Sequence, residues 1–147
     1  QRLELLGTDT RRQTNLDGVL RLPATQQLEA LKYMEVKAIE AGHISCTVKE
    51  SLLEPIFELG EKFVNVARAE YPPGIIGPFA LQSAFIPGPP KETAVVFDIS
   101  MRVQGSPGTM FTPYSGYYYG QSLSVGKRVA MEIRKAIQQN RLEETVT

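Results

Sequence analysis

The segment FALQSAFIPGPPKETAVVFDISMRV, residues Phe79–Val103, decides the fold class of this chain. Two runs rich in apolar and β-branched residues flank the turn-forming sequence PGPPKE, and we expect them to be strands over Phe79–Ile86 and Thr93–Val103. A connection of six residues is too short for a crossover between parallel strands. The sequence therefore predicts an antiparallel hairpin.

Polar side chains alternate with apolar ones along the second strand, so Asp98, Ser100 and Arg102 share one face. The loop length places Gln82 opposite either Phe97 or Asp98. The alternation favours Asp98, because a slip of one residue would exchange the two faces. Opposite side chains lie about 5 Å apart, so Gln82 and Asp98 could share one Mg²⁺ while Arg102 binds an anion beside it. A solvated polar face is the alternative interpretation.

Two amphipathic segments are expected to form the long helices. Residues Leu52–Ala69 repeat apolar side chains every three to four positions, after a capping-box sequence that begins at Ser51. Residues 124–139 repeat apolar side chains every four positions. Because strands and helices do not alternate strictly, we predict a single α+β domain over residues 1–147. Its helices should pack on one side of a mostly antiparallel sheet.

The N-terminal part of the chain is polar and rich in turn-forming residues. We expect a strand at its start that leads into a basic turn, which could bind phosphate or could simply be exposed to solvent. The charged and polar residues of this turn are Asp9, Arg11, Arg12 and Asn15.

Further elements are expected before the first long helix. Residues 15–23 should form a turn and a short strand, and residues 24–34 a helix with Thr25 as its N-cap. Residues 43–50 have the β-branched alternation of a strand. Its cysteine, Cys46, is expected to be buried.

Composition excludes several classes of function. The 147 residues contain sixteen basic and sixteen acidic side chains, and a net charge of zero argues against a general nucleic-acid binder. A single cysteine cannot form an intramolecular disulfide, and no apolar run is long enough to span a membrane. We therefore expect a cytoplasmic protein without nucleic-acid or membrane partners. Because the chain starts at Gln1 rather than Met, we expect it to be a piece of a longer protein.

A loop rich in glycine and tyrosine, GSPGTMFTPYSGYYYGQ, precedes the last helix. Its tyrosines could stack on bases, fold back on their own domain or contact another subunit. His43 is the only histidine, so any catalytic arrangement that needs one must use it.

Several segments of the sequence resemble the sequences of one protein family. They are LELLGTDTRRQTNLDGVLRLPA, VKESLLEPIFELGEKFV, PPGIIGPFALQS, VVFDISMRVQG and PYSGYYYGQSLSVGKRVAMEIRKAI. They are similar, in order and over nearly the whole chain, to the C-terminal part of the archaeal PurP ligases, which have an ATP-grasp fold. These enzymes convert AICAR (5-aminoimidazole-4-carboxamide ribonucleotide) to its N-formyl derivative FAICAR. The resemblance implies that ATP phosphorylates formate and that the AICAR amine attacks the resulting formyl phosphate.

The same resemblance assigns roles to individual residues. It implies that Gln82 and Asp98 hold Mg²⁺ or Mn²⁺, that Asp9 lies near ATP and that His43 contacts AICAR. Arg102 would act as a catalytic residue that faces the phosphates or formyl phosphate. The chain departs from the family pattern at Asp98, where Glu is usual, at His43, where Asn is usual, and in the loop GSPGTM.

We therefore expect the C-terminal portion of a formate-dependent ligase of purine biosynthesis. Its partners would be ATP, formate, AICAR and the remainder of the enzyme. The N-terminal domain and the nucleotide-clamping subdomain of an ATP-grasp enzyme are missing from these residues, so the chain alone should be inactive. We also expect a homo-oligomer. The alternatives are a nucleotide-binding relative without catalysis and an oligomerisation module.

Overall fold

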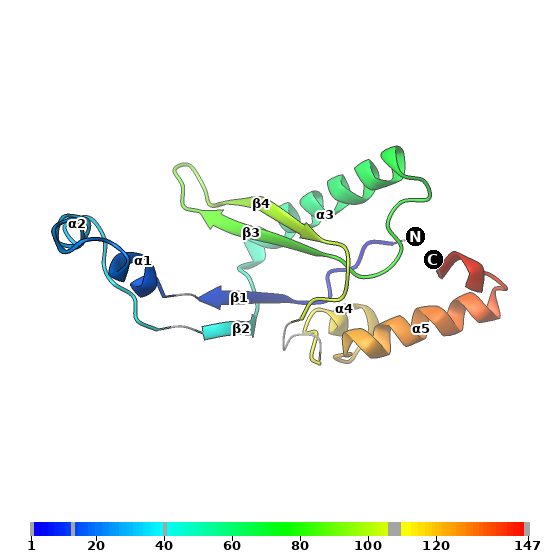
Figure 1. Cartoon of the computed structure of the whole chain (residues 1–147). Helices are drawn as coiled ribbons and strands as arrows, with labels where there is room; N and C mark the ends of the chain where they lie inside the picture. Colours follow the sequence, from blue (N-terminus) through cyan, green and yellow to red (C-terminus); the bar gives the residue numbers. More distant parts are fainter. Residues whose placement is uncertain (1, 13, 40, 106–109, 146–147) are drawn as a thin grey trace.

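The computed structural model describes residues 2–12, 14–39, 41–105 and 110–145. Within these ranges, four strands form two separate two-stranded antiparallel sheets (Figure 1). One pairs β1 (Thr8–Arg12) with β2 (Ala41–Cys46), and the other pairs β3 (Ala80–Ile86) with β4 (Thr93–Ser100). The predicted α+β class is confirmed. Part of the GSPGTM loop, residues 106–109, lies outside the described residues.

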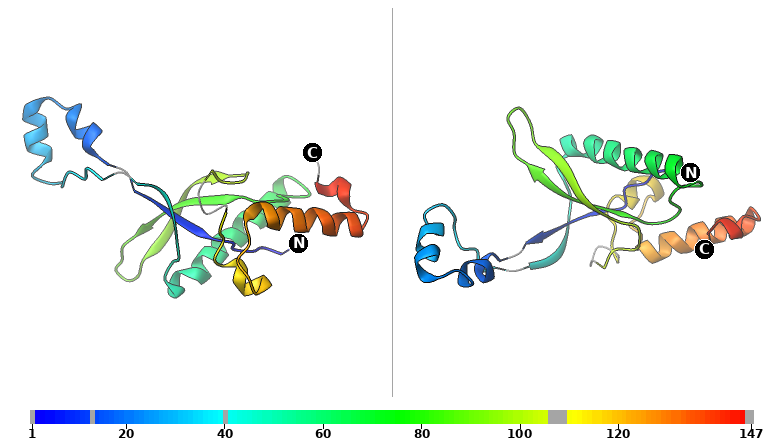
Figure 2. Two further views of the ribbon diagram at one scale, coloured as in Figure 1. Left: turned by 90° about the horizontal axis from the view of Figure 1, so that it is seen from below. Right: turned by 45° about the horizontal axis from the view of Figure 1, so that its top comes forward.

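The helices surround the two hairpins unevenly. In Figures 1 and 2, α1 and α2 form a lobe at one end of the β1–β2 hairpin, away from α3 and α5. α3 lies against the β3–β4 hairpin, where the rings of Phe63 and Phe79 are 4.9 Å apart. The helices are α1 (Leu16–Leu20), α2 (Ala24–Ala30), α3 (Glu50–Glu70), α4 (Ser115–Tyr119), α5 (Val125–Gln138) and a 3₁₀-helix (Leu142–Thr145).

The β3–β4 hairpin uses both of the registers that its loop length allows. Near the loop Ser83 pairs with Val96, and beyond a β-bulge Gln82 pairs with Asp98. The bulge leaves Phe97 as the extra residue, so the facing pattern shifts by one position. The hairpin therefore has one of the two registers on each side of the bulge.

The predicted extension of the second strand to Val103 is wrong, because β4 ends at Ser100. In the register of Gln82 and Asp98, the residue opposite Arg102 is Pro78. Proline has no backbone N–H to donate, so the ladder cannot continue there. The residues after Ser100 leave the sheet as irregular backbone.

The N-terminal elements differ from expectation. The predicted basic turn is strand β1, and the predicted short strand after it is helix α1. The helix after Pro23 is confirmed as α2, although its N-cap is Pro23 rather than Thr25. The predicted strand that contains Cys46 is confirmed as β2, and Cys46 itself is half-buried.

Both long helices are confirmed, but their caps differ. α3 begins one residue before Ser51, its N-cap is Lys49, and the expected side-chain cap does not form. α5 begins after Ser124, whose Oγ accepts a 3.1 Å hydrogen bond from the Lys127 N–H. This bond satisfies one of the free donors at the helix start. The C-terminal tail is a 3₁₀-helix.

The core is small for a chain of this length. Large apolar side chains stay exposed on the β3–β4 hairpin, where Phe97 is 69% and Met101 71% exposed. The apolar face that the alternation predicts is therefore covered only in part by the described chain. The buried apolar residues are Val19, Leu52, Tyr114, Leu123, Val125 and Ala136.

Among residues 2–12, 14–39, 41–105 and 110–145, no helix combines the length and the apolar character needed to cross a bilayer.

Candidate metal and nucleotide site

The register of the β3–β4 hairpin brings Gln82 directly opposite Asp98, as the alternation predicts. Gln82 Nε2 donates one hydrogen bond to Asp98 Oδ2 and a second, 3.2 Å long, to Ser100 Oγ. The three side chains therefore share one face beside the bulge. Gln82 and Asp98 are exposed to solvent, so a ligand could reach them.

The donor atoms of this pair suit a hard cation. Asp98 offers a carboxylate, and rotation of the Gln82 amide would turn Oε1 instead of Nε2 toward it. Mg²⁺ takes oxygen ligands and usually keeps several waters or phosphate oxygens, so two protein ligands are sufficient. Within the described ranges, no cluster of three or more His, Cys, Asp or Glu side chains could hold a metal. The pair therefore suits a Mg²⁺ ion shared with a phosphate, rather than a cage made wholly by protein.

Arg102 lies beyond the end of β4, so it is not part of the strand face that carries Asp98. Its exposed guanidinium donates through Nη1 to the carbonyl oxygen of Val103, at 3.1 Å. The expectation that Arg102 continues the polar row of the strand is therefore wrong. Its contact with an anion stays a prediction.

The β1–β2 hairpin brings Asp9 and His43 together. Arg11 pairs with His43 in the strand register, and Asp9 lies two positions away on the same face. His43 Nδ1 is 3.3 Å from Asp9 Oδ2. Their contact was not predicted, although both residues were. Among the described residues, no hydrogen bond or ion pair joins them to Gln82 or Asp98.

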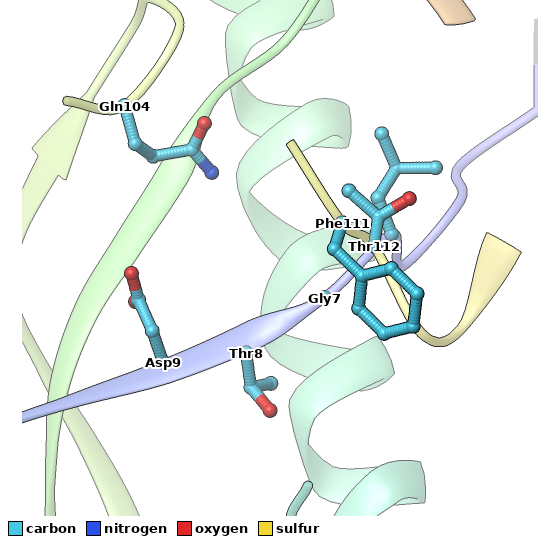
Figure 3. Close-up of a pocket in the computed structure, with 7 residues that line it drawn as sticks. Gly7, Thr8, Asp9, Gln104, Phe111 and Thr112 are labelled. Atoms are coloured by element: carbon cyan, nitrogen blue, oxygen red, sulfur yellow. The ribbon is translucent and has the colours of Figure 1, made fainter. Parts of the chain in front are cut away.

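A cavity of about 40 Å³ lies beside Asp9, between β1 and the segment that follows β4 (Figure 3). Asp9 extends from β1 toward Gln104, and Phe111 and Thr112 line another side. Gln104, Phe111 and Thr112 were not predicted as site residues. Gln104 directly follows the predicted strand in sequence, but its position beside Asp9 depends on long-range packing.

A charged cluster positions the segment that leads into β1. Glu4 is 9% exposed, and its Oε2 accepts a 2.8 Å hydrogen bond from Arg128 Nε, while its Oε1 pairs with Arg2 Nη2 at 2.5 Å. The Tyr119 hydroxyl lies 3.0 Å from both carboxylate oxygens. Burial alone would raise the pKa of Glu4, but the hydrogen bonds from Arg128, Arg2 and Tyr119 outweigh it and lower the pKa to about 2.

Neighbouring contacts complete this cluster. Burial and the hydrogen bond to Glu4 raise the pKa of Tyr119, so its hydroxyl stays a donor. The Arg128 guanidinium lies 5.3 Å from the centre of the Tyr119 ring, and its Nη1 is 2.7 Å from Glu132 Oε1. The segment before β1 is thus held against α4 and α5 by these contacts.

Three of the four tyrosines in the loop before α5 fold back on their own chain. The hydroxyl of Tyr114 accepts from the Val48 N–H at 3.0 Å, and that of Tyr118 accepts from the Leu5 N–H at 3.3 Å. Tyr119 binds Glu4, as described above. Tyr117 is 82% exposed and lines an apolar groove of about 360 Å³ between α3 and α4.

Comparisons with known proteins agree with the family resemblance of the sequence segments quoted above. The chain is 40% identical over 147 residues to a protein of Methanocaldococcus jannaschii and 38% identical over 148 residues to one of Sulfurisphaera tokodaii. Both relatives are named 5-formaminoimidazole-4-carboxamide-1-(beta)-D-ribofuranosyl 5'-monophosphate synthetase. Each alignment covers 99% of this chain, but only 39% and 42% of the respective relative. The chain thus spans about two fifths of their length.

A solved structure and a family comparison extend this similarity. The crystal structure of an IMP biosynthesis protein PurP from Thermococcus kodakaraensis matches with a TM-score of 0.66 and 33% identity. It covers 97% of this chain and 43% of that protein. The resemblance to PurP ligases is thereby confirmed. A family described as "Domain of unknown function (DUF1297)" matches residues 1–147. Because that match extends over the whole sequence, the chain belongs to the DUF1297 family.

Proposed function

We propose that this chain is the metal-binding part of an ATP- and formate-dependent ligase that converts AICAR to FAICAR. The observation that carries the proposal is the contact between Gln82 and Asp98, within a chain that is 40% identical over its length to a synthetase of this product. The chain spans about two fifths of the length of these relatives, and apolar side chains on its β3–β4 hairpin are exposed. Both observations support a larger enzyme whose remainder covers that face of the hairpin.

The reaction has two steps in this proposal. A formate oxygen attacks the γ-phosphorus of ATP, which releases ADP and gives formyl phosphate. The AICAR amine then attacks the formyl carbon, phosphate leaves, and the amine loses a proton to give FAICAR. A bound Mg²⁺ would supply charge neutralisation at the phosphates.

Each named residue has a role in holding these groups. Gln82 and Asp98 would orient the phosphates through the metal. Asp9 would bind the nucleotide, and His43 beside it would contact AICAR. Arg102, with its exposed guanidinium, would reach the transferred phosphoryl group.

The first test is an assay of the isolated chain. Purified residues 1–147 with ATP, formate, AICAR and Mg²⁺ should form no FAICAR above background, because about three fifths of the relatives' length is missing. The full-length protein that contains this chain should form it. FAICAR formation by the chain alone would contradict the division of the site between this chain and the remainder.

A non-catalytic nucleotide sensor is the second candidate function. It is favoured by the contact between Asp9 and His43, because this contact lies beside a cavity and involves no metal ligand. Calorimetry on the full-length protein that shows binding of ATP or AICAR without any turnover would support the sensor over the ligase.

Assembly is tested at Tyr117. We propose a homo-oligomer in which the exposed Tyr117 ring and its apolar groove contact another subunit. Tyr117→Ser should then lower the mass measured by light scattering to that of a smaller species, because an exposed aromatic ring contributes much apolar contact area. Tyr33→Ser, which changes an equally exposed tyrosine, is the matched control. An unchanged mass for Tyr117→Ser would show that this groove does not join subunits.

A further inference from the structure

Helix α5 carries an apolar stripe that stays largely exposed. Val129, Ile133 and Ile137 recur every four residues and therefore lie on one side of the helix. Ile133 is 41% and Ile137 58% exposed. In Figure 1 and in the right-hand view of Figure 2, this part of α5 lies apart from α3 and from both hairpins. A surface helix normally packs its apolar stripe against a core, so this stripe is suited to a partner beyond the described residues.

One flank of the stripe is basic. Lys127 and Arg134 are seven residues apart, so they project from the same side of α5, about 10.5 Å apart along its axis. Both side chains are exposed. Among residues 2–12, 14–39, 41–105 and 110–145, no ion pair includes either of them. Their charges are therefore available to an acidic partner.

The apolar groove between α3 and α4 has the complementary pattern. Leu53 and Phe57 line it from α3, and Glu50 is the only charged residue in the described part of its lining. Glu54 and Glu61 follow on the same side of α3 as Glu50, and they too are seven residues apart. All three carboxylates are exposed, and within the described ranges none of them is in an ion pair. The groove therefore combines an apolar floor with an acidic flank.

We propose that α5 of one copy of this chain docks in the groove between α3 and α4 of a second copy. The apolar stripe of α5 covers the floor of the groove and the ring of Tyr117, as an amphipathic helix does in an apolar groove. Lys127 and Arg134 then face Glu54 and Glu61, and the equal spacing of the two pairs lets both form at once. The inference rests on the assembly proposed for Tyr117 and names the segment that fills its groove.

The contacts at the start of α5 make this docking intermolecular. Arg128 Nε is 2.8 Å from Glu4 Oε2, and its guanidinium lies over the Tyr119 ring. Within one copy, α5 could turn back into the groove beside α4 only by breaking these contacts. Each copy therefore gives one helix and accepts one, either by exchange across a two-fold axis or around a closed ring.

The test reverses the charges in the full-length protein and measures self-association by sedimentation equilibrium. Glu54→Lys together with Glu61→Lys should weaken self-association about 100-fold, because like charges then face each other. Lys127→Glu together with Arg134→Glu should weaken it by a similar factor. All four changes together should restore the association constant to within about 3-fold of the unchanged protein, because both pairs form again with opposite polarity. A variant that merely failed to fold would show no such recovery.

A control and the ligase assay separate this inference from the others. Lys135→Glu changes an exposed residue on the opposite side of α5 and should leave self-association unchanged. A single-chain mass for the unchanged protein, or no recovery in the four-fold variant, would overturn the inference. If Tyr117→Ser dissociates the protein but the reversal of Lys127 and Arg134 does not, the groove joins subunits through another segment and only this inference fails. If no FAICAR forms but the four-fold variant reassembles, the ligase proposal fails and this one stands.

Discussion

Replacing Asp98 with alanine in the full-length protein is expected to lower the rate of FAICAR formation at least about 100-fold. Asp98 is the only carboxylate in the hydrogen-bonded group with Gln82 and Ser100, so its loss leaves one neutral ligand. The half-saturating Mg²⁺ concentration should rise as well. Steady-state rates over a range of Mg²⁺ concentrations measure both quantities, and a Mn²⁺ titration measures metal affinity without turnover.

Matched substitutions make this result specific for the metal. Asp98→Asn keeps the shape and the contact with Gln82 but removes the charge, so it should lose metal affinity like alanine. Asp98→Glu keeps the carboxylate and should retain Mg²⁺-dependent turnover. Ser83→Ala changes an exposed neighbour on the other side of the bulge and should have no effect. Unchanged Mg²⁺ dependence in Asp98→Ala would refute the assignment.

The β3–β4 hairpin was predictable because its information is local. A short loop and a strict alternation are enough to place Gln82 opposite Asp98, and the structure has this register. The bulge at Phe97 was not predicted, because loop length allowed two registers and the sequence did not indicate that both occur. The early end of β4 could have been anticipated from Pro78, which cannot donate to the ladder.

The β1–β2 hairpin was not predictable as a pair, for a physical reason. β1 consists of polar residues without alternation, so it resembles a turn, and its partner β2 lies about thirty residues further along the chain. Strand pairing at that separation depends on tertiary contacts more than on propensity. The contact between Asp9 and His43 and the position of Gln104 beside Asp9 both arise from such contacts. Their residues could be singled out, but their proximity could not.

The second large effect concerns stability and centres on Glu4. Glu4→Ala should reduce the local stability of the segment before β1 and of α5 by about 2 kcal/mol at neutral pH. The change removes a carboxylate that is 9% exposed and leaves Arg2 and Arg128 without this partner. Hydrogen exchange of the full-length protein, followed by mass spectrometry, should show about 30-fold less protection of α5 amides. Glu132→Gln removes the half-exposed partner of Arg128 and should have a much smaller effect.

The pH dependence of this difference identifies its source. The pKa of Glu4 is lowered from 4.5 to about 2 in the folded protein, so the folded state favours the charged carboxylate. The stabilisation is then fully present above about pH 4.5 and is lost as the pH falls toward 2. The difference in α5 protection between the unchanged protein and Glu4→Ala should shrink over the same interval. A difference that stays constant from pH 7 to 3 would show that packing, rather than the charge of Glu4, holds the segment before β1 against α5.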